Sequence, residues 1–474
     1  MKKILIAFLL LCPLICCNKS QTDPAASYIK SLVVSLHTDN GLRVDVDIEF
    51  RQNCDYSIRY WKKDNPNLVQ TTRSRHVNGL NDRVTLMYMY ADSEYELEVA
   101  IEGTPIRSNP VMFRTGSIPS GVTSYIVENS LSEKIPGYIM QAALRADGYM
   151  TIADTDGNVL WYEHCQPANR NFTSQFEAFD LKFNDNRIWF LNGYLVTPEA
   201  SGITSMATNI GCIDFEGNVG CLWASDKGFS PAPLAHHEIL ELKDGNILVV
   251  SSSQKIYDLT PIGGEPNTLV SGDGYTIFSR DGKIVSQWDC FGEIDPLTCE
   301  YVNARSFYWD LVHANALSID SDGNYYMSFN RINQIWKIDP DSGKVLYRVG
   351  ENGNVALDPK GYPSGVHAVT PLTPDRLLCL DNGIASGKSR GLIYKVNPQK
   401  MTAEIETLVE LPEEYSSYDR SNVSLIDGGK VLMFGMTNAK VVVFTDLKGN
   451  IIKTLRTSVA SYRTIYIDRL PAIQ

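Results

Sequence analysis

Short runs of alternating apolar and polar residues fill most of the chain, and this period of two predicts β-strands rather than helices. The first runs lie at residues 31–36, 42–48, 56–60 and 95–101, with short polar breaks between them. Such a pattern is typical of a β-sandwich. We therefore predict a small N-terminal β-sandwich domain over residues 27–117, followed by a Gly-Ser-Pro linker at 116–121.

After the linker, a unit of strands punctuated by Asp-Gly or similar turns recurs six times. The copies begin near residues 137, 179, 236, 313, 367 and 421. An Asp-Gly turn between alternating apolar runs is a strong hairpin signal. Six copies of about four strands each predict a six-bladed β-propeller over residues 122–474, with one sheet per blade around a central channel. The segment 462–470 would supply a strand that closes the ring, and the fold class is all-β.

The chain begins with two lysines and an apolar run from Ile4 to Cys17, which is too short for a membrane span and predicts a signal peptide over residues 1–17. The run ends in Leu14-Ile15-Cys16-Cys17, which resembles a bacterial lipobox. We expect lipidation at Cys17, with Cys16 as the alternative acceptor and an ordinary cleaved signal as the alternative reading. Residues 18–26 form a polar tether. The expected location is periplasmic or on the outer membrane, with the membrane contacted through the lipid anchor.

Export permits disulfides, and seven cysteines follow Cys17. Cys212 and Cys221 flank a predicted hairpin turn, and Cys290 and Cys299 bracket one loop. We consider these two pairings against the alternative that all seven are small buried apolar residues, because connectivity cannot be deduced from sequence.

The overall composition sets limits on the partners. The formal net charge is −12, which disfavours nucleic acid, because phosphate binding needs a basic surface. A small anionic substrate in one local cationic pocket stays compatible with this charge.

Four of the seven histidines open three consecutive repeats: His236-His237, His313 and His367. In a propeller these first strands line the channel, so the imidazoles would face one another. Arg331 lies one hairpin after His313, and Asn315 shares the face of His313. Imidazole can act as nucleophile or proton donor, and guanidinium binds oxyanions. Zinc is a lesser alternative, since an adjacent arginine would repel a divalent cation, so we expect no metal and no cofactor.

These residues resemble a known family. The segment 309–317, Trp-Asp-Leu-Val-His-Ala-Asn-Ala-Leu, with Arg331 one hairpin later, is similar to the signature of bacterial arylsulfotransferases that do not use the nucleotide sulfate donor. His236-His237-Glu238 and the segment from His367 to Asp381-Asn382-Gly383 match further family segments. The resemblance covers the whole mature chain.

The resemblance implies a six-bladed propeller that works by a ping-pong route. A phenolic sulfate ester would donate its sulfuryl group to His367, and a phenol would then accept it. His313 and Arg331 would hold the sulfuryl oxygens, assisted by Asn315. His237 or His236 would be the general acid and base. Strand alternation lets only one of that pair face inward: register favours His236, while the family pattern favours His237.

Two other functions compete with transfer. One is a non-catalytic binding propeller, and the other is a hydrolase that passes the sulfuryl group to water. Tyr308, Trp309 and Phe329 are candidate pocket aromatics or blade packing. The strand after His367 contains Pro371, which requires an edge or a bulge. Because sandwich domains often mediate subunit contacts, a homodimer is a further expectation.

Overall fold

The computed structural model of the chain describes residues 23–131, 134–144, 148–164, 175–182, 187–194, 206–224 and 235–473. Strands dominate these ranges, and the one α-helix within them is the four-residue α2 (Ala304–Phe307). The prediction of an all-β chain is confirmed.

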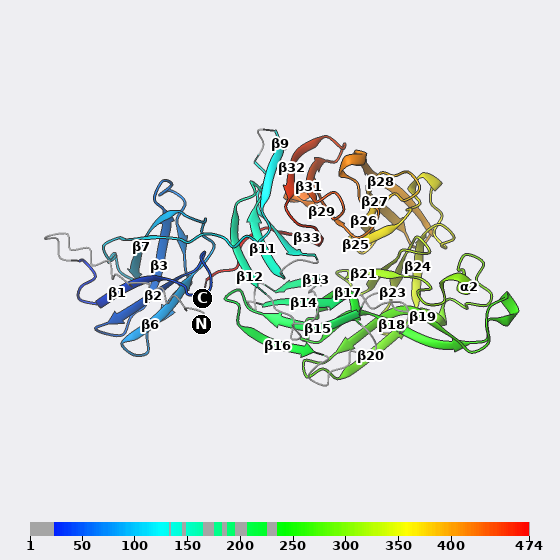
Figure 1. The fold of residues 1–474 in the computed structure, drawn as a ribbon, viewed down its shortest axis with the longest axis horizontal. Helices are drawn as coiled ribbons and strands as arrows, with labels where there is room; N and C mark the ends of the chain where they lie inside the picture. Colours follow the sequence, from blue (N-terminus) through cyan, green and yellow to red (C-terminus); the bar gives the residue numbers. More distant parts are fainter. Residues whose placement is uncertain are drawn as a thin grey trace, which may run out of the picture.

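Two antiparallel sheets make up the N-terminal region (Figure 1). One sheet has the order β1-β2-β6 and the other has the order β4-β3-β7-β8, with β5 paired to β3. Residues on β2 alternate between buried and half-buried, as the sequence pattern predicts for a strand with one face on a core. The strands are β1 (Ile29–Leu36), β2 (Val44–Phe50), β3 (Asp55–Lys62), β4 (Gln70–Thr71), β5 (Arg75–His76), β6 (Asn81–Leu86), β7 (Glu94–Ile101) and β8 (Val111–Arg114).

Six further antiparallel sheets follow along the chain, and we number them sheets 1 to 6. Sheets 1 and 2 contain β10 (Tyr138–Ala143), β11 (Tyr149–Asp154), β12 (Val159–His164), then β13 (Gln175–Lys182), β14 (Arg187–Tyr194), β15 (Met206–Ile213) and β16 (Val219–Ala224). Sheets 3 and 4 contain β17 (Ala235–Glu241), β18 (Ile247–Tyr257), β19 (Thr268–Phe278), β20 (Ile284–Asp289), then β21 (Ala314–Ile319), β22 (Tyr325–Phe329), β23 (Gln334–Ile338) and β24 (Val345–Gly350). Sheets 5 and 6 contain β25 (Val366–Thr373), β26 (Arg376–Asp381), β27 (Arg390–Asn397), β28 (Thr402–Glu410), then β29 (Asn422–Ile426), β30 (Val431–Met436), β31 (Val441–Asp446) and β32 (Ile451–Thr457).

The first and the last strand of this region each pair with a sheet from the opposite end of the region. Strand β33 (Ser461–Ile467) pairs with β10 of sheet 1, and β9 (Tyr125–Ser130) pairs with β32 of sheet 6. The first strands β13, β17, β21, β25 and β29 each contact the next one, and β29 contacts β33 (Figure 1). The segment predicted to add a strand after residue 462 therefore does so as β33.

Several of the predicted turns are organised by an aspartate that lies three residues before the turn glycine. Asp154 accepts hydrogen bonds from the main-chain nitrogens of Asp156 and Asn158 at 3.0 and 2.8 Å. Gly157 has a φ of +85°, which favours glycine because it has no Cβ. The same arrangement recurs at the turns that begin with Asp214, Asp320 and Asp446.

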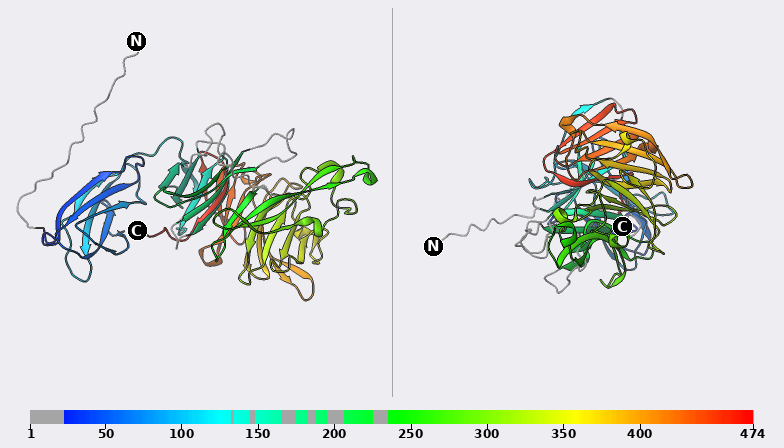
Figure 2. Two further views of the ribbon diagram at one scale, coloured as in Figure 1. Left: turned by 90° about the horizontal axis from the view of Figure 1, so that it is seen from below. Right: turned by 90° about the vertical axis from the view of Figure 1, so that its right-hand side faces the viewer.

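The N-terminal sheets lie beside sheet 1 at one end of the molecule (Figure 2). Asn40 Nδ2 donates to the carbonyl of Tyr162 at 2.9 Å, and the buried Arg43 pairs with Glu163 at 2.7 Å. Arg43 also donates to the carbonyl of Phe215 on the loop after β15. Polar contacts through Arg43 therefore join the N-terminal region to both sheet 1 and sheet 2.

The cysteine pairings had different outcomes. Cys212 lies directly opposite Cys221 in the β15–β16 register, and the side chain of Cys221 lies outside the described residues, so this pairing stays a prediction. The Cys290–Cys299 pairing is wrong, because both are free thiols. Cys290 is held by a turn that Asp289 caps, and its sulfur packs against Gly272.

Strand β25 accommodates Pro371 as expected, since it is the edge strand of sheet 5 and its register shifts between Pro371 and Thr373. Within the described ranges, no helix has the length and apolarity needed to cross a membrane. Residues 1–22, which include Cys16 and Cys17, lie outside the described residues.

Candidate functional site

The first strands of sheets 3, 4 and 5 bring the predicted histidines together. The ring of His237 lies 5.1 Å from the ring of His313. It also lies 5.7 Å from the ring of Tyr462 on β33, which in turn lies 5.8 Å from the ring of His367. Imidazoles from three separate repeats therefore form one cluster, closed on its fourth side by β33.

Bulges in the first strands aim these side chains. The β17, β21 and β25 registers each shift beside the histidine position. His237 has a φ of +61° and His313 a φ of +53°, a left-handed conformation that is uncommon for residues other than glycine. Of the pair, His237 contacts His313 and Tyr462, whereas His236 contacts Asp273 and Ser252. The two Nδ1 atoms lie 2.7 Å apart, because the bulge breaks the alternation.

Asp310 holds both His313 and Arg331. Its Oδ2 lies 2.8 Å from His313 Nδ1 and accepts from Arg331 Nη2 at 2.9 Å and Nε at 3.2 Å. Burial opposes the carboxylate charge, but His313 and Arg331 outweigh it and lower the pKa of Asp310 to about 2. Burial also opposes protonation of His313, yet Asp310 raises its pKa above the usual value. Asp310 thus favours a cationic His313 and occupies two of the donors of Arg331.

A second carboxylate supports the histidine pair of sheet 3. Asp273 on β19 lies 3.2 Å from His236 Nε2, and Ser252 Oγ lies 3.0 Å from the same nitrogen. The other oxygen of Asp273 accepts from the main-chain nitrogen of Ala314 at 2.7 Å, which ties sheet 3 to sheet 4. Burial first, then the neighbouring His236, lowers the pKa of His237 well below its ordinary value, so His237 is neutral near pH 7.

His367 is the least exposed of the four histidines at the site. Its Nε2 lies 3.3 Å from the hydroxyl of Tyr462, and its buried Nδ1 has no hydrogen-bond partner among the described residues. Burial, and next the positive charge of Arg463, lowers the pKa of His367 well below its usual range. His367 is therefore a neutral ring that keeps a lone pair, as a nitrogen nucleophile requires.

Asn315 is fully buried between two strands. Its Nδ2 donates to the carbonyl of Val366 at 2.9 Å, and its Oδ1 accepts from Ser328 at 2.6 Å. The amide thus fastens β21 to β25 directly before His367.

The aromatic candidates separate into two groups. Phe329 is buried and its ring lies 4.6 Å from that of Trp336, so it packs within sheet 4. The rings of Phe307 and Trp309 lie 4.3 and 5.0 Å from the guanidinium carbon of Arg331, while Tyr308 is exposed. Phe307 and Trp309 therefore hold the face of Arg331 at the site.

Sequence reasoning assigned no role to five residues of the cluster: Asp273, Ser252, Asp310, Tyr462 and Arg463. Asp310 is the one that a signal could have revealed, because it stands three residues before His313 inside the family-like segment. Tyr462 and Arg463 come from β33, far along the chain, and only the tertiary fold places them here.

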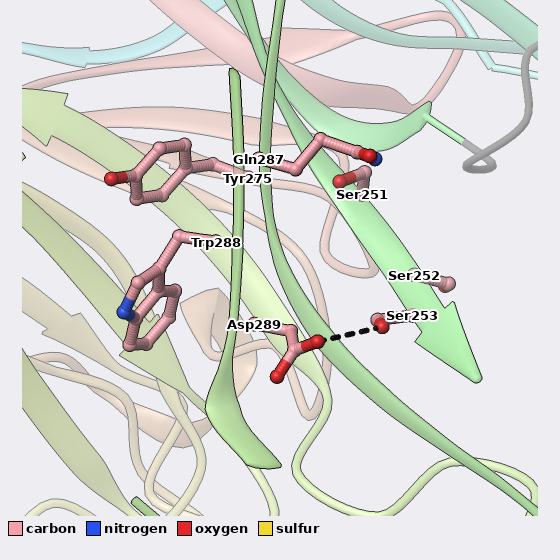
Figure 3. Close-up of a pocket in the computed structure, with 7 residues that line it drawn as sticks. All are labelled: Ser251, Ser252, Ser253, Tyr275, Gln287, Trp288 and Asp289. Carbon is pink, nitrogen blue, oxygen red and sulfur yellow. Dashed lines mark hydrogen bonds between the residues drawn. The ribbon is translucent and has the colours of Figure 1, made fainter. Parts of the chain in front are cut away.

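A small pocket lies on sheet 3 (Figure 3). It has a volume of about 120 Å³ and is lined by Ser251, Ser252, Ser253, Tyr275, Gln287, Trp288 and Asp289. Asp289 accepts a hydrogen bond from Ser253 at 3.1 Å, drawn dashed in Figure 3. Because Ser252 contacts both this pocket and His236, the pocket wall and the cluster share one residue. Among the residues the structure describes, no group of three or more His, Cys, Asp or Glu side chains is arranged to hold a metal ion.

Buried imidazoles beside fixed positive charges, on the first strands of an all-β chain, define a β-sheet protein whose site suits a small oxyanion. The chain belongs to the arylsulfotransferase family: the family model described as Arylsulfotransferase (ASST) matches residues 125–454. That span contains every predicted catalytic and substrate-binding residue. No curated protein matches the chain.

Several solved structures resemble the chain at low identity. They include a protein of unknown function from Bacteroides caccae (13% identity, 71% of this chain and 100% of that chain, TM-score 0.43). They also include the periplasmic gluconolactonase of Pseudomonas aeruginosa (10% identity, 87% of this chain and 99% of that chain, TM-score 0.35). Another is virginiamycin B lyase from Staphylococcus aureus (14% identity, 71% of this chain and 100% of that chain, TM-score 0.31). With TM-scores below 0.5, these similarities carry no argument about activity.

Proposed function

We propose that the protein is an aryl-sulfate sulfotransferase that moves a sulfuryl group from a phenolic sulfate ester to a phenolic acceptor through a sulfated His367. The observation that carries this proposal is the neutral, enclosed imidazole of His367 within a cationic surrounding, in a chain of the arylsulfotransferase family. A neutral nitrogen can attack sulfur, and nearby positive charge favours the anionic donor.

In the first half-reaction, a nitrogen of His367 forms a bond to sulfur while the bond from sulfur to the aryl oxygen breaks. The aryl oxide leaves with the bonding electron pair. The cationic His313 and the two Nη1 donors of Arg331 hold the sulfuryl oxygens, since Asp310 already accepts from Nε and Nη2. Asn315 contributes by holding β25 in place.

In the second half-reaction, the acceptor phenol gives its proton to His237 and its oxygen attacks sulfur. The nitrogen–sulfur bond breaks, and His367 returns to the neutral form. His237 then passes its proton to the aryl oxide released in the first half-reaction or to solvent, which restores the neutral base. Asp273 accepts from His236 Nε2, which leaves His236 Nδ1 to accept from His237 Nδ1. This order leaves the lone pair of His237 on Nε2, where it acts as the base. His236 acts through His237.

We propose that sheets 1 to 6 are the blades of a closed six-bladed propeller over residues 122–474, preceded by the sandwich domain at 27–117. The pairing of β33 with β10 and of β9 with β32 supports this, because each joins one end of the region to the other. The contacts between successive first strands support a ring with those strands at its centre.

We also propose export with a cleaved signal over residues 1–17, lipidation at Cys17 and a location on the periplasmic or outer-membrane side, with homodimer formation as a further proposal. The support is the lysine-led apolar run and its Cys16-Cys17 end. Metabolic labelling with a fatty acid tests it: label is expected in the full chain and absent from Cys17→Ser. Label that persists in Cys17→Ser and disappears in Cys16→Ser would move the anchor to Cys16.

The activity is tested with 4-nitrophenyl sulfate in the presence and absence of phenol. Release of nitrophenol that depends on phenol is expected for transfer. Equal release without phenol would indicate hydrolysis, and background release under both conditions would favour a binding protein. A His367→Ala variant controls for non-enzymatic release.

A further inference from the structure

Arg463 enters the site from a strand that the family match does not include. The match ends at residue 454, whereas β33 spans Ser461–Ile467. The Arg463 side chain is 8% exposed, so its charge is enclosed among the sheets rather than solvated. A buried arginine is costly unless its charge and donors are used, which raises the question of what it does there.

The guanidinium joins three sheets. Strand β33 belongs to sheet 1, yet Arg463 Nη2 donates to the carbonyl of Asn315 in sheet 4 at 2.6 Å. The same nitrogen pairs with Glu238 in sheet 3 at 3.2 Å. Glu238 directly follows His237, and Asn315 stands two residues after His313. One side chain therefore ties together the two strands that carry these histidines.

The charge of Arg463 is paired with that of Glu238, but one of its donors is left without a partner among the described residues. Glu238 is its one ion-pair partner among the described residues, and its buried Nε has no hydrogen-bond partner there. After burial, Arg463 is the first cause of the lowered pKa of His367, followed by His313 and Arg420. The other groups that face His367 are the hydroxyl of Tyr462 and the main chain of Ser421.

We propose that Arg463 is a positioning residue of the sulfuryl-transfer site: it fixes the His237 and His313 strands opposite His367 and presents a permanent positive charge to that ring. The inference rests on the proposed function for its catalytic meaning. It extends the site beyond the family match to the C-terminal strand, and it gives that strand a role in the chemistry as well as in the fold.

Three variants separate the geometry from the charge. Arg463→Lys keeps the charge and loses the planar fork, and Arg463→Met loses both. Arg463→Met combined with Glu238→Gln removes both charges of the ion pair together. Arg456→Met is the matched control, since Arg456 also pairs with a glutamate, Glu128, but on the exposed edge of sheet 6.

The first readout is kcat/KM for 4-nitrophenyl sulfate with phenol at pH 8 and at pH 5.5. Without the charge, the His367 ring stays protonated to higher pH, so activity is lost earlier on the acid side. We expect kcat/KM at pH 8 divided by kcat/KM at pH 5.5 to rise at least about fivefold over wild type in Arg463→Met and in the double variant. In Arg463→Lys it should stay within about twofold while both values fall roughly tenfold. A loss that is equal at both pH values in all three variants would overturn the proposal.

The second readout needs no substrate and therefore stands apart from the proposed function. Protein with ¹⁵N-labelled histidine is titrated by NMR, and the His367 signal is identified by its absence in His367→Gln. We expect the His367 ring to stay neutral from pH 8 to pH 5.5 in wild type and in Arg463→Lys. In Arg463→Met we expect the ring to take up a proton within that range. An Arg463→Met titration identical to wild type would refute the charge role. Wild-type protein without turnover but with the expected titrations would instead count against the transferase activity alone.

Discussion

At the scale of single residues, the site depends on opposite protonation states in neighbouring imidazoles. Asp310 raises the pKa of His313, whereas burial and positive neighbours lower the pKa of His237 and of His367. The three rings share one cluster, so small differences in their surroundings decide which ring carries charge. A cation to hold an anion, a neutral nucleophile and a neutral base thus come from a single residue type.

The pairing with Asp310 predicts a shift on the alkaline side of the pH profile. Because the carboxylate raises the pKa of His313, the cationic ring is present at low pH and is lost as pH rises through that value. Asp310→Asn removes the carboxylate, so His313 should lose its proton at lower pH and activity should fall earlier on the basic limb. The measurement is kcat/KM against pH above 6. An unchanged basic limb would show that His313 is not the titrating group.

At the scale of elements, bulges in the first strands decide which side chains reach the cluster. Strand β25 carries its positive φ at Ala368, with a φ of +51°, directly after His367. A left-handed residue without a glycine costs free energy and persists where the surroundings fix it. The bulges thus orient the histidine rings at some cost in the free energy of unfolding.

Substitution of Ala368 tests whether the positive φ at this position lowers stability and supports activity. Ala368→Gly should keep activity and leave the free energy of unfolding equal or higher, because glycine adopts positive φ readily. Ala368→Val should lower the free energy of unfolding by about 1–3 kcal/mol and reduce kcat, because a β-branched residue resists that conformation. Urea denaturation and turnover of the two variants give the comparison. Equal stability of both variants would mean that the backbone at 368 relaxes without cost.

Most strands and turns could be predicted from the sequence, because period-two alternation and Asp-Gly turns are local signals. The histidines of three repeats could also be assigned to one cluster, since each holds the same place in its repeat. Which of His236 and His237 contacts His313 could not be predicted, because a bulge such as that at His237 has no reliable local signature. Asp273 was missed because its contact with His236 depends on how β17 and β19 pack within sheet 3. Arg463 was missed because it contacts sheets that are distant from it in sequence.

At the scale of the whole molecule, the N-terminal region is fastened to the sheets that follow it. Arg43, 4% exposed, reaches Glu163 in sheet 1 and the carbonyl of Phe215 after β15. Removing one partner of an enclosed ion pair leaves the other uncompensated. This contact lies on the side of sheets 1 and 2, whereas the histidine cluster is built by sheets 3 to 5 and β33.

Arg43→Met should therefore affect stability more than catalysis. We expect the free energy of unfolding to fall by about 2–4 kcal/mol, while kcat/KM at 25 °C stays within about twofold of wild type. Calorimetry and a standard activity assay measure the two effects. Glu163→Gln is the companion variant and should lose less, because this side chain is 20% exposed against 4% for Arg43. A large loss of kcat/KM in a folded Arg43→Met protein would contradict the separation of interface and site.

The central claim is that His367 carries the sulfuryl group between donor and acceptor. The most direct measurement is mass spectrometry of the protein after brief exposure to 4-nitrophenyl sulfate without phenol, under non-acidic digestion. The account predicts one added sulfuryl group on the peptide that contains His367, its disappearance when phenol is added, and no such adduct in His367→Ala. An adduct on another residue, or turnover by His367→Ala at the wild-type rate, would contradict it.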